Sequence, residues 1–377
     1  MRCGPFVLPG PASAPRRSTC ACASVRTGVA RAQKPGVSCP PQREFGGDAA
    51  AGAALTVPPP HPVSMTISYV RELTLPDHTR QQHARAALRG EEQRVSRGAY
   101  VTSALWAESD LRTRYLLRVR AVGETRHFRP VLSHWSAAAI HGLPIIGDWP
   151  EAVHITVGPT SGGRSRGGVV KHSLALRDDE VVDVDDQLVT SVARTVVDLA
   201  VVASFRGAMV LADHCLHVER FDRMQPLLSR DELANQIARR MPFRGHARAR
   251  AVERLATAKA DSPLESVSRV TMHEIGCPPP QLQTPFHDAE GFIAETDFYW
   301  EDVGLIGEAD GDQKYLDAAK RSGRTIDQVK LDEKVREDRL RALPRGVTRW
   351  RWATAINPVA LHRHLSGAGI VLPRLRR

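Results

Sequence analysis

Cysteine is scarce in the main body of this 377-residue chain, where Cys215 and Cys277 are the two that occur after residue 64. Two thiols far apart in the sequence build no disulfide framework, so a reducing cytoplasm is the expected compartment. Long apolar runs are also missing. The run at 196–203 is interrupted by Asp198 and is much shorter than the roughly 18 apolar residues that a membrane helix needs. The sequence therefore predicts a protein with no membrane partner.

Lysine is the third scarce residue, since seven lysines stand against 45 arginines. Together with abundant alanine, this bias is typical of a GC-rich bacterial genome. The net charge of +10 is then weak evidence for nucleic-acid binding, and half of it lies in residues 1–64. Four of the seven lysines fall between residues 314 and 334, and this local cluster is the more informative feature.

Residues 1–64 are rich in proline, glycine, alanine and serine and show no helical or strand periodicity. We expect either a disordered tail or a translation start at Met65 that leaves this segment outside the protein.

Residues 65–105 are predicted to form a small winged-helix-like unit. A helix is expected over 78–89, closed by Gly90, because glycine tolerates the left-handed backbone of a helix C-cap. The alternating stretch that follows predicts a hairpin carrying Arg94 and Arg97. These arginines are candidate contacts to DNA phosphates, and ordinary surface charge explains them equally well.

Residues 106–221 show mixed patterns and predict an α/β domain. Helices are expected at 112–122 and 133–140 and after Thr190-Ser191, and strands at 153–157 and 169–172. Arg194 and Asp198, four residues apart, predict an ion pair within one helix. The histidines of this region do not show metal-ligand spacing and are expected to be structural or surface residues: His134, His141, His154 and His172.

The arginine-rich stretch 222–260 predicts a charged helical connector. Residues 261–377 then predict the order α-β-β-β-α-β-α. Ser262 and Glu265 have the spacing of a capping box, with Pro263 in the first helical turn.

Three carboxylates lie near the ends of the second and third predicted strands of this last region. Glu308 and Asp310 are two residues apart, so they point to the same face, and Asp297 lies on the neighbouring strand. Crowded like charges are destabilising unless a cation neutralises them, and carboxylate oxygens suit Mg²⁺. Asp297 and Glu308 are therefore the predicted metal ligands, and Lys314 is a predicted phosphate contact. The alternative for the acids is that they are solvated strand-end and turn residues.

Residues 261–377 resemble the PD-(D/E)xK nuclease superfamily, especially the very-short-patch-repair endonucleases. The resemblance is carried by Pro263-Leu264-Glu265-Ser266, Thr296-Asp297-Phe298 and Ile306-Gly307-Glu308-Ala309-Asp310-Gly311. It implies that Asp297 and Glu308 hold the metal and that Glu265 assists them. The sequence departs from the family at Asp310, which stands where the family has lysine. Lys314, Lys334 and Arg339 are the candidate substitutes.

Residues 66–220 resemble the AbiEi-type antitoxins of abortive-infection systems, which join a winged helix to an α/β antitoxin domain. The stretches that carry this resemblance are 97–101, 132–138, 141–144, 153–156 and 190–199. It implies DNA binding by the winged helix and a toxin protein as a partner.

Taken together, these features predict a bacterial, cytoplasmic, DNA-associated protein of antitoxin or transcriptional-regulator type, with a nuclease-like C-terminal domain that hydrolyses phosphodiesters with Mg²⁺. The alternative is a non-catalytic DNA-binding regulator or antitoxin, favoured by Asp310. A third hypothesis is an antitoxin that binds only protein.

Overall fold

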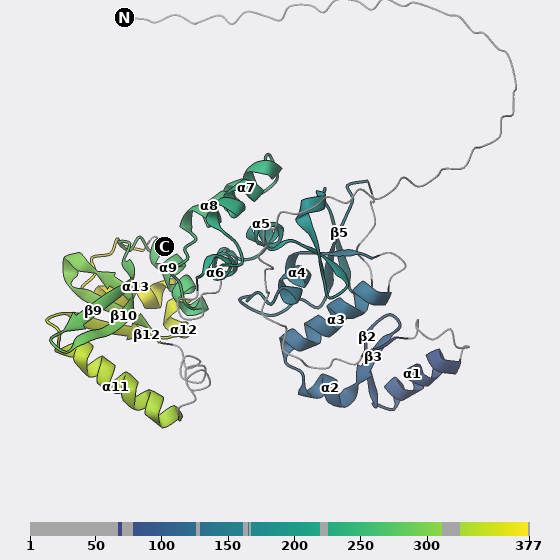
Figure 1. Cartoon of the computed structure of the whole chain (residues 1–377), viewed down its shortest axis with the longest axis horizontal. Coiled ribbons are helices and arrows are strands. Elements are labelled where there is room, and N and C mark those ends of the chain that lie inside the picture. Colours follow the sequence, from purple (N-terminus) through teal and green to yellow (C-terminus); the bar gives the residue numbers. More distant parts are fainter. Residues whose placement is uncertain are drawn as a thin grey trace, which may run out of the picture. The chain divides into compact units, whose positions relative to one another are not determined.

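The computed structural model describes residues 67–69, 78–125, 129–160, 165, 167–218, 225–310 and 325–375. All of them belong to one compact unit, 55–377. The expectations for residues 1–64 and Lys314 concern positions outside these ranges. The described part contains helices and three β-sheets (Figure 1). This mixture agrees with the α/β and α+β fold class expected from the sequence pattern. None of its helices is apolar over a length that would cross a membrane.

The first sheet has the strand order β1-β3-β2 and is accompanied by two helices. Its elements are β1 (Ser68–Tyr69), α1 (His78–Leu88), β2 (Glu92–Ser96), β3 (Ala99–Thr102) and α2 (Ser103–Glu108). The predicted end of α1 is confirmed, because Gly90 has a φ of 77° and its N–H donates to the Ala87 carbonyl. The predicted hairpin is also present as the antiparallel pair β2 and β3.

The second sheet has the order β6-β5-β4-β8-β7. This region contains α3 (Leu111–Thr125), β4 (Val131–Leu132), α4 (His134–Ile140), β5 (Val153–Val157), β6 (Val169–Ser173), β7 (Val181–Val184), β8 (Gln187–Thr190) and α5 (Val192–Val202). One face of the sheet packs on α3 through a core that includes Tyr115, Val119 and Ile155. The predicted strand 153–157 is confirmed residue for residue as β5.

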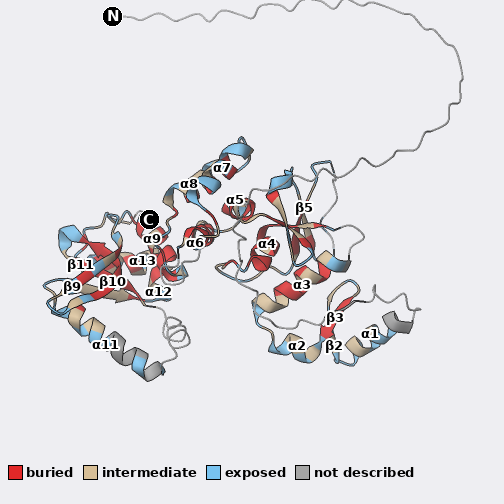
Figure 2. Ribbon diagram, in the orientation of Figure 1, coloured by how far each residue is buried: buried red, intermediate tan, exposed pale blue. Residues whose placement is uncertain are grey.

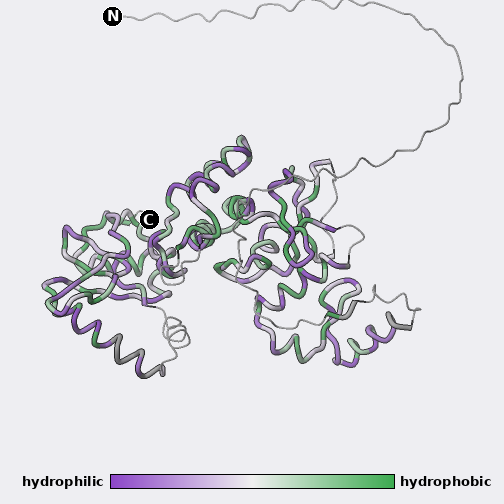
Figure 3. Tube along the Cα trace, viewed as in Figure 1, coloured by the Kyte–Doolittle hydropathy of each residue, from purple (hydrophilic) through white to green (hydrophobic). Residues whose placement is uncertain are grey.

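Residues 222–260, predicted as a charged connector, contain α7 (Arg230–Arg240) and α8 (His246–Leu255). Each helix exposes charged residues on one side and buries apolar ones on the other (Figure 2). Leu233, Ile237, Ala249 and Val252 join the same core as residues of α5 and of α6 (Phe205–Leu216). Figure 3 shows the corresponding hydrophobic stretches in α5 and α6. The segment is therefore part of a helical core as well as a link in the chain.

The third sheet has the order β12-β11-β10-β9, in which β12 runs parallel to β11 and the other pairs are antiparallel. The region contains α9 (Pro263–Glu274), β9 (Gln281–Asp288), β10 (Gly291–Trp300), β11 (Leu305–Ala309), α11 (Ile326–Ala342), β12 (Gly346–Trp350), α12 (Trp352–Ala355) and α13 (Pro358–Gly367). Among the described residues, the elements follow the predicted order, with the one-turn α12 added before the last helix. The predicted cap of α9 is present, since Ser262 Oγ accepts from the Glu265 N–H at 3.2 Å.

The two faces of this sheet pack on different helices. Phe298, Trp300 and Trp350 lie in a core with residues of α9 and α13. Tyr299 and Ile306 lie in a second core with Leu340 of α11. Because successive residues of a regular strand point to opposite faces, this division indicates the face of the residues next to these positions, Asp297 on β10 and Glu308 on β11.

We predict that Gly307→Ala lowers the free energy of unfolding by about 2 kcal/mol, as overpacking of a core does. A Cβ at Gly307 would lie 2.8 Å from Trp350 and 2.9 Å from Trp300. Neither indole is able to yield easily, because Trp350 Nε1 donates to Ser268 Oγ and Trp300 Nε1 to the Pro278 carbonyl, both at 2.8 Å. Urea unfolding would measure the loss. Gly367→Ala, where nothing lies within 4 Å, is the control and should be neutral or slightly stabilising.

Candidate functional site

Asp297 and Glu308 occupy facing positions on β10 and β11. The pairs Phe298–Gly307, Tyr299–Ile306 and Trp300–Leu305 set an antiparallel register whose next step places Asp297 opposite Glu308. The alternation of the two cores puts both side chains on the face that packs on α11. The expectation that Asp297 and Glu308 lie on neighbouring strands, where their carboxylates can approach each other, is consistent with this register.

Both carboxylates are buried, with 7% of each residue exposed. The Ala309 backbone N–H donates to Asp297 Oδ2 at 2.7 Å, which ties this carboxylate to the residue next to Glu308. Asp297 therefore lies close to the end of β11 rather than in solvent. The structure thus disfavours the alternative of solvated strand-end acids for this pair.

The other predicted members of the site have different surroundings. Asp310 is half-buried directly after β11, and its N–H donates to the Trp350 carbonyl. Lys314 lies outside the described residues. Lys334 is exposed on α11. Arg339 forms two hydrogen bonds with the Asp288 carboxylate, at 2.8 and 2.5 Å, so it is engaged at the β9–β10 turn.

Arg349 is a cation near this pair that sequence reasoning did not select. It lies on β12, paired in the parallel register with Glu308, and its Nη1 is 3.5 Å from Glu337 Oε2. The last predicted strand of residues 261–377 contains this arginine, but its position beside Glu308 depends on the pairing of β12 with β11.

Glu265 is 2% exposed at the start of α9. It accepts hydrogen bonds from the Asp261 N–H at 2.9 Å, the Ser262 hydroxyl at 2.8 Å and Gln283 Nε2 at 3.0 Å. Gln283, on β9, was also not selected from the sequence. Its bond to Glu265 links the helix to the strand that flanks β10.

Within the described ranges, no group of three histidine, cysteine, aspartate or glutamate side chains is arranged to hold a metal ion. Of the acids predicted for the site, the described residues bring Asp297 and Glu308 to facing positions. Two carboxylates are a sufficient protein contribution for Mg²⁺, which keeps several water ligands.

Arg94 and Arg97 are exposed on the β2–β3 hairpin. Arg94 Nε donates to the Ser96 carbonyl at 3.2 Å, within the same hairpin, and Arg97 lies at the turn. This placement leaves both guanidinium groups at the molecular surface, far from the acids in the sequence.

The middle region contains a histidine cluster that the spacing did not predict. His134, at the start of α4, stacks on His172 of β6 with ring centroids 3.6 Å apart. His154 Nδ1 of β5 is hydrogen-bonded to His172 Nε2 at 2.9 Å. His134 has a φ of 54°, a left-handed backbone that costs a residue with a Cβ about 1–2 kcal/mol.

Burial keeps these histidines neutral. Burial is the larger cause and the neighbouring His172 the second, and together with the other nearby groups they lower the pKa of His134 to about 2 and that of His154 to about 4. Burial lowers the pKa of His172 as well. Arg194 and Arg240 are positive charges that also disfavour a proton on His134.

These shifts predict a specific pH dependence. A folded-state pKa below the unfolded value makes stability largest above pH 6.5 and lowers it as the pH falls, because the unfolded chain then binds more protons. We compare wild type with His134→Asn, since asparagine tolerates left-handed backbone. Between pH 7 and pH 5.5 the free energy of unfolding should fall by about 1 kcal/mol more in wild type than in this variant. Urea unfolding at the two pH values measures this difference. An equal loss in both proteins would contradict the interpretation.

Arg194 is at the centre of a buried ion network beside this cluster. Its side chain is 1% exposed; Nε lies 3.0 Å from both oxygens of Asp198, and Nη1 lies 2.8 Å from Glu180 Oε2. Asp198 also accepts from Arg240 Nη1 at 2.9 Å, and Gln236 donates to Glu180. The predicted Arg194–Asp198 pair within α5 is confirmed. Arg240 links Asp198 to α7.

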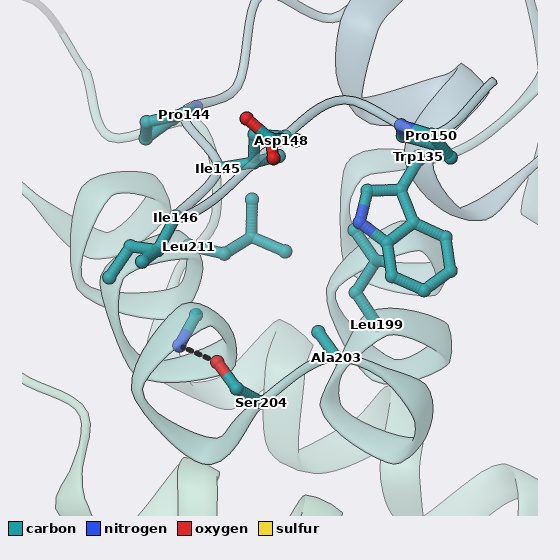
Figure 4. Close-up of a pocket in the computed structure, with 11 residues that line it drawn as sticks. Trp135, Pro144, Ile145, Ile146, Asp148, Pro150, Leu199, Ala203, Ser204 and Leu211 are labelled. Carbon is teal, nitrogen blue, oxygen red and sulfur yellow. Dashed lines mark hydrogen bonds between the residues drawn. The ribbon is translucent and has the colours of Figure 1, made fainter.

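A cavity of about 220 Å³ lies elsewhere in the middle region, between the 144–150 segment and helices α5 and α6 (Figure 4). Its walls are mostly apolar and include Trp135, Leu199 and Leu211. Asp148 and Ser204 are its polar side chains, and Ser204 Oγ accepts from the Gly207 N–H at 3.0 Å. None of the residues predicted for catalysis lines it, so the cavity contributes nothing to the acid pair.

Comparison with known proteins gives short matches. No protein-family model matches the chain, and no solved structure matches it. Two uncharacterized proteins of Mycobacterium tuberculosis, from strains CDC 1551 / Oshkosh and ATCC 25618 / H37Rv, are each 32% identical to it over 125 residues. The match covers 33% of this chain and 44% of each relative, so the chain spans less than half the length of these relatives.

Proposed function

We propose that the chain is a DNA-associated protein of antitoxin or regulator type, and that residues 261–377 form a Mg²⁺-dependent nuclease domain of PD-(D/E)xK type. The observation that carries the proposal is the buried pair Asp297 and Glu308, facing each other across β10 and β11. Two buried carboxylates at facing positions repel each other, and a bound cation relieves that repulsion.

The donor set fits Mg²⁺, since this ion binds through one or two carboxylates and prefers oxygen ligands. Asp297 and Glu308 would hold it. When bound, such an ion lowers the pKa of a water molecule and offsets negative charge on a phosphoryl oxygen. The Ala309 N–H holds Asp297 in one orientation, and Arg349, paired with Glu308 in the register of β12, adds a positive charge near the pair.

Asp310 favours a second candidate function, a regulator whose nuclease-like fold binds DNA without cutting it. An acid at this position supplies no positive charge to a transition state. A single assay separates the two. The purified full chain should cleave supercoiled, linear or single-stranded DNA with Mg²⁺ or Mn²⁺ and be inactive in EDTA. DNA binding at low salt without cleavage under any of these conditions would favour the regulator, and absence of both would refute each proposal.

The proposal assigns DNA-phosphate contacts to the β2–β3 hairpin of the winged-helix-like unit. We expect Arg94→Gln with Arg97→Gln to weaken binding similarly on all DNA sequences and to reduce the slope of log affinity against log salt by about 2, roughly one per lost contact. Arg89→Gln is the matched control, because this exposed arginine is paired with Glu91 at 2.7 Å. Fluorescence anisotropy across a salt series measures both. An unchanged slope in the double variant would remove the hairpin from the interface.

A further inference from the structure

The 144–150 segment, which forms one wall of the cavity in the middle region, has a constrained backbone. Pro144 and Pro150 stand at its two ends, where the proline ring fixes φ. Between them Gly147 turns the chain with a φ of 89°, a conformation that residues with a Cβ rarely adopt. The other walls come from α4, α5 and α6, which contribute to the helical core. The cavity is therefore shaped by the fold before any ligand enters.

The interior of the cavity suits a small apolar group. Leu199 and Leu211 are buried side chains of the helical core, and Trp135 adds an aromatic surface. The cavity has a volume of about 220 Å³. An apolar cavity of roughly 150 Å³ is already large enough to bind benzene. The space thus accepts one ring with a short side chain, which is less than a drug-sized molecule.

The mouth of the cavity carries a negative charge. Among the described residues that line it, Asp148 is the one with a charged side chain. Asp148 is exposed, whereas Leu199 and Leu211 are buried, so the carboxylate lies at the solvent side of the apolar walls. Figure 4 shows Asp148 and Ser204 on opposite sides of the cavity. A ligand with an apolar body and one charged end matches this division.

The arginines that neighbour the lining residues in sequence or space are engaged by other groups. Arg206 donates to the Glu274 carboxylate. Arg248 donates to the backbone carbonyls of Val201 and Ala203. Both guanidinium groups are thus directed to protein partners, and the charge that the cavity offers to a ligand is that of Asp148.

We propose that this cavity binds a small organic ammonium ion, with the apolar body against Trp135, Leu199 and Leu211 and the amine hydrogen-bonded to Asp148. A hydrogen bond between an ammonium and a carboxylate is charge-assisted, so it favours an amine over an alcohol of the same shape. A ligand with a carboxylate would face the like charge of Asp148. None of these residues belongs to the acid pair, so the inference does not depend on the proposed nuclease function.

The test is calorimetric titration of the full chain with phenylethylamine, phenylethanol and phenylacetate, which share a ring and differ in charge. Wild type is expected to bind the amine about tenfold more tightly than the alcohol and not to bind phenylacetate. Asp148→Asn should weaken amine binding about tenfold and leave the affinity for the alcohol unchanged. Glu151→Gln is the matched control, because this exposed acid follows the same segment and does not line the cavity. Its affinities should equal those of wild type.

Two cavity-filling variants locate the binding. Ala203→Leu adds volume from the end of α5 and should abolish binding of both the amine and the alcohol. If circular dichroism shows that this variant does not fold, Ile145→Phe fills the space from the 144–150 segment. Binding that survives filling places the ligand elsewhere and overturns the proposal.

Three results with the wild type and Asp148→Asn would also overturn it. They are equal affinity of wild type for the amine and the alcohol, unchanged amine affinity in Asp148→Asn, and no binding of any of the three compounds. The nuclease proposal is decided by DNA cleavage and not by these titrations, so the failure of one is distinguishable from the failure of the other.

Discussion

On the proposed nuclease function, Asp297→Asn and Glu308→Gln are each expected to reduce Mg²⁺-dependent DNA cleavage about a thousandfold. Loss of one of the two proposed metal ligands would remove roughly 4 kcal/mol of transition-state stabilisation, at about 1.4 kcal/mol for each factor of ten. Both substitutions are nearly isosteric. An amide oxygen at position 297 is still able to accept the Ala309 N–H, so the strand pairing should persist and circular dichroism should be unchanged. Initial cleavage rates at saturating Mg²⁺ are the measurement.

Asp302→Asn is the control for this prediction, because Asp302 is an exposed acid in the turn that joins β10 to β11. Its cleavage rate should equal that of wild type. If Asp297→Asn and Glu308→Gln both kept wild-type rates, the acid pair would not be the cleavage site. If only the two acid variants lost activity while remaining folded, chemistry rather than stability would explain the loss.

Arg194→Met is expected to lower the free energy of unfolding by about 4 kcal/mol, the cost of removing one partner from a buried ion pair. Methionine replaces much of the arginine volume but leaves Asp198 and Glu180 buried with fewer partners. Asp198 would keep Arg240, and Glu180 would keep Gln236. Since a domain is stable by only about 5–15 kcal/mol, the variant should show a clearly lower urea midpoint.

Arg239→Met, on α7, is the matched control for Arg194→Met. Arg239 pairs with Asp179 at the surface, where 38% and 53% of the two side chains are exposed. Exposed pairs of this kind contribute about 0–1 kcal/mol. Equal losses in the two variants would mean that burial of the Arg194 network adds nothing to stability.

Local signals in the sequence were sufficient for many element boundaries. The end of α1 at Gly90, the Ser262 cap of α9 and the limits of β5 depend on interactions within a few residues. Such interactions are encoded by residue type and spacing, so the pattern alone predicts them. The order of elements in residues 261–377 followed from the same signals.

Short or paired elements were missed for the opposite reason. β4 has two residues, Val131–Leu132, and is too short to show any alternation. β7 and β8 are joined by Asp185 and Asp186, both with left-handed backbone, a turn that aspartate supports. The arginines of residues 222–260 predicted a charged connector. The burial of Leu233 and Val252 was not predicted, because it depends on contact with α5 and α6.

Some features of the candidate site were likewise predictable from the sequence, and others depend on the tertiary structure. Residue types and spacing selected Asp297, Glu308 and Glu265, because acids on strand ends and at a helix start are visible in one dimension. That Asp297 faces Glu308, with Gln283 on one side and Arg349 on the other, was decided by the pairing of β9, β10, β11 and β12. The meeting of His134, His154 and His172 was likewise decided by tertiary contacts. Sequence periodicity specifies which face a residue takes within its own strand. The partner across the sheet is set by register, which is an outcome of packing between distant segments.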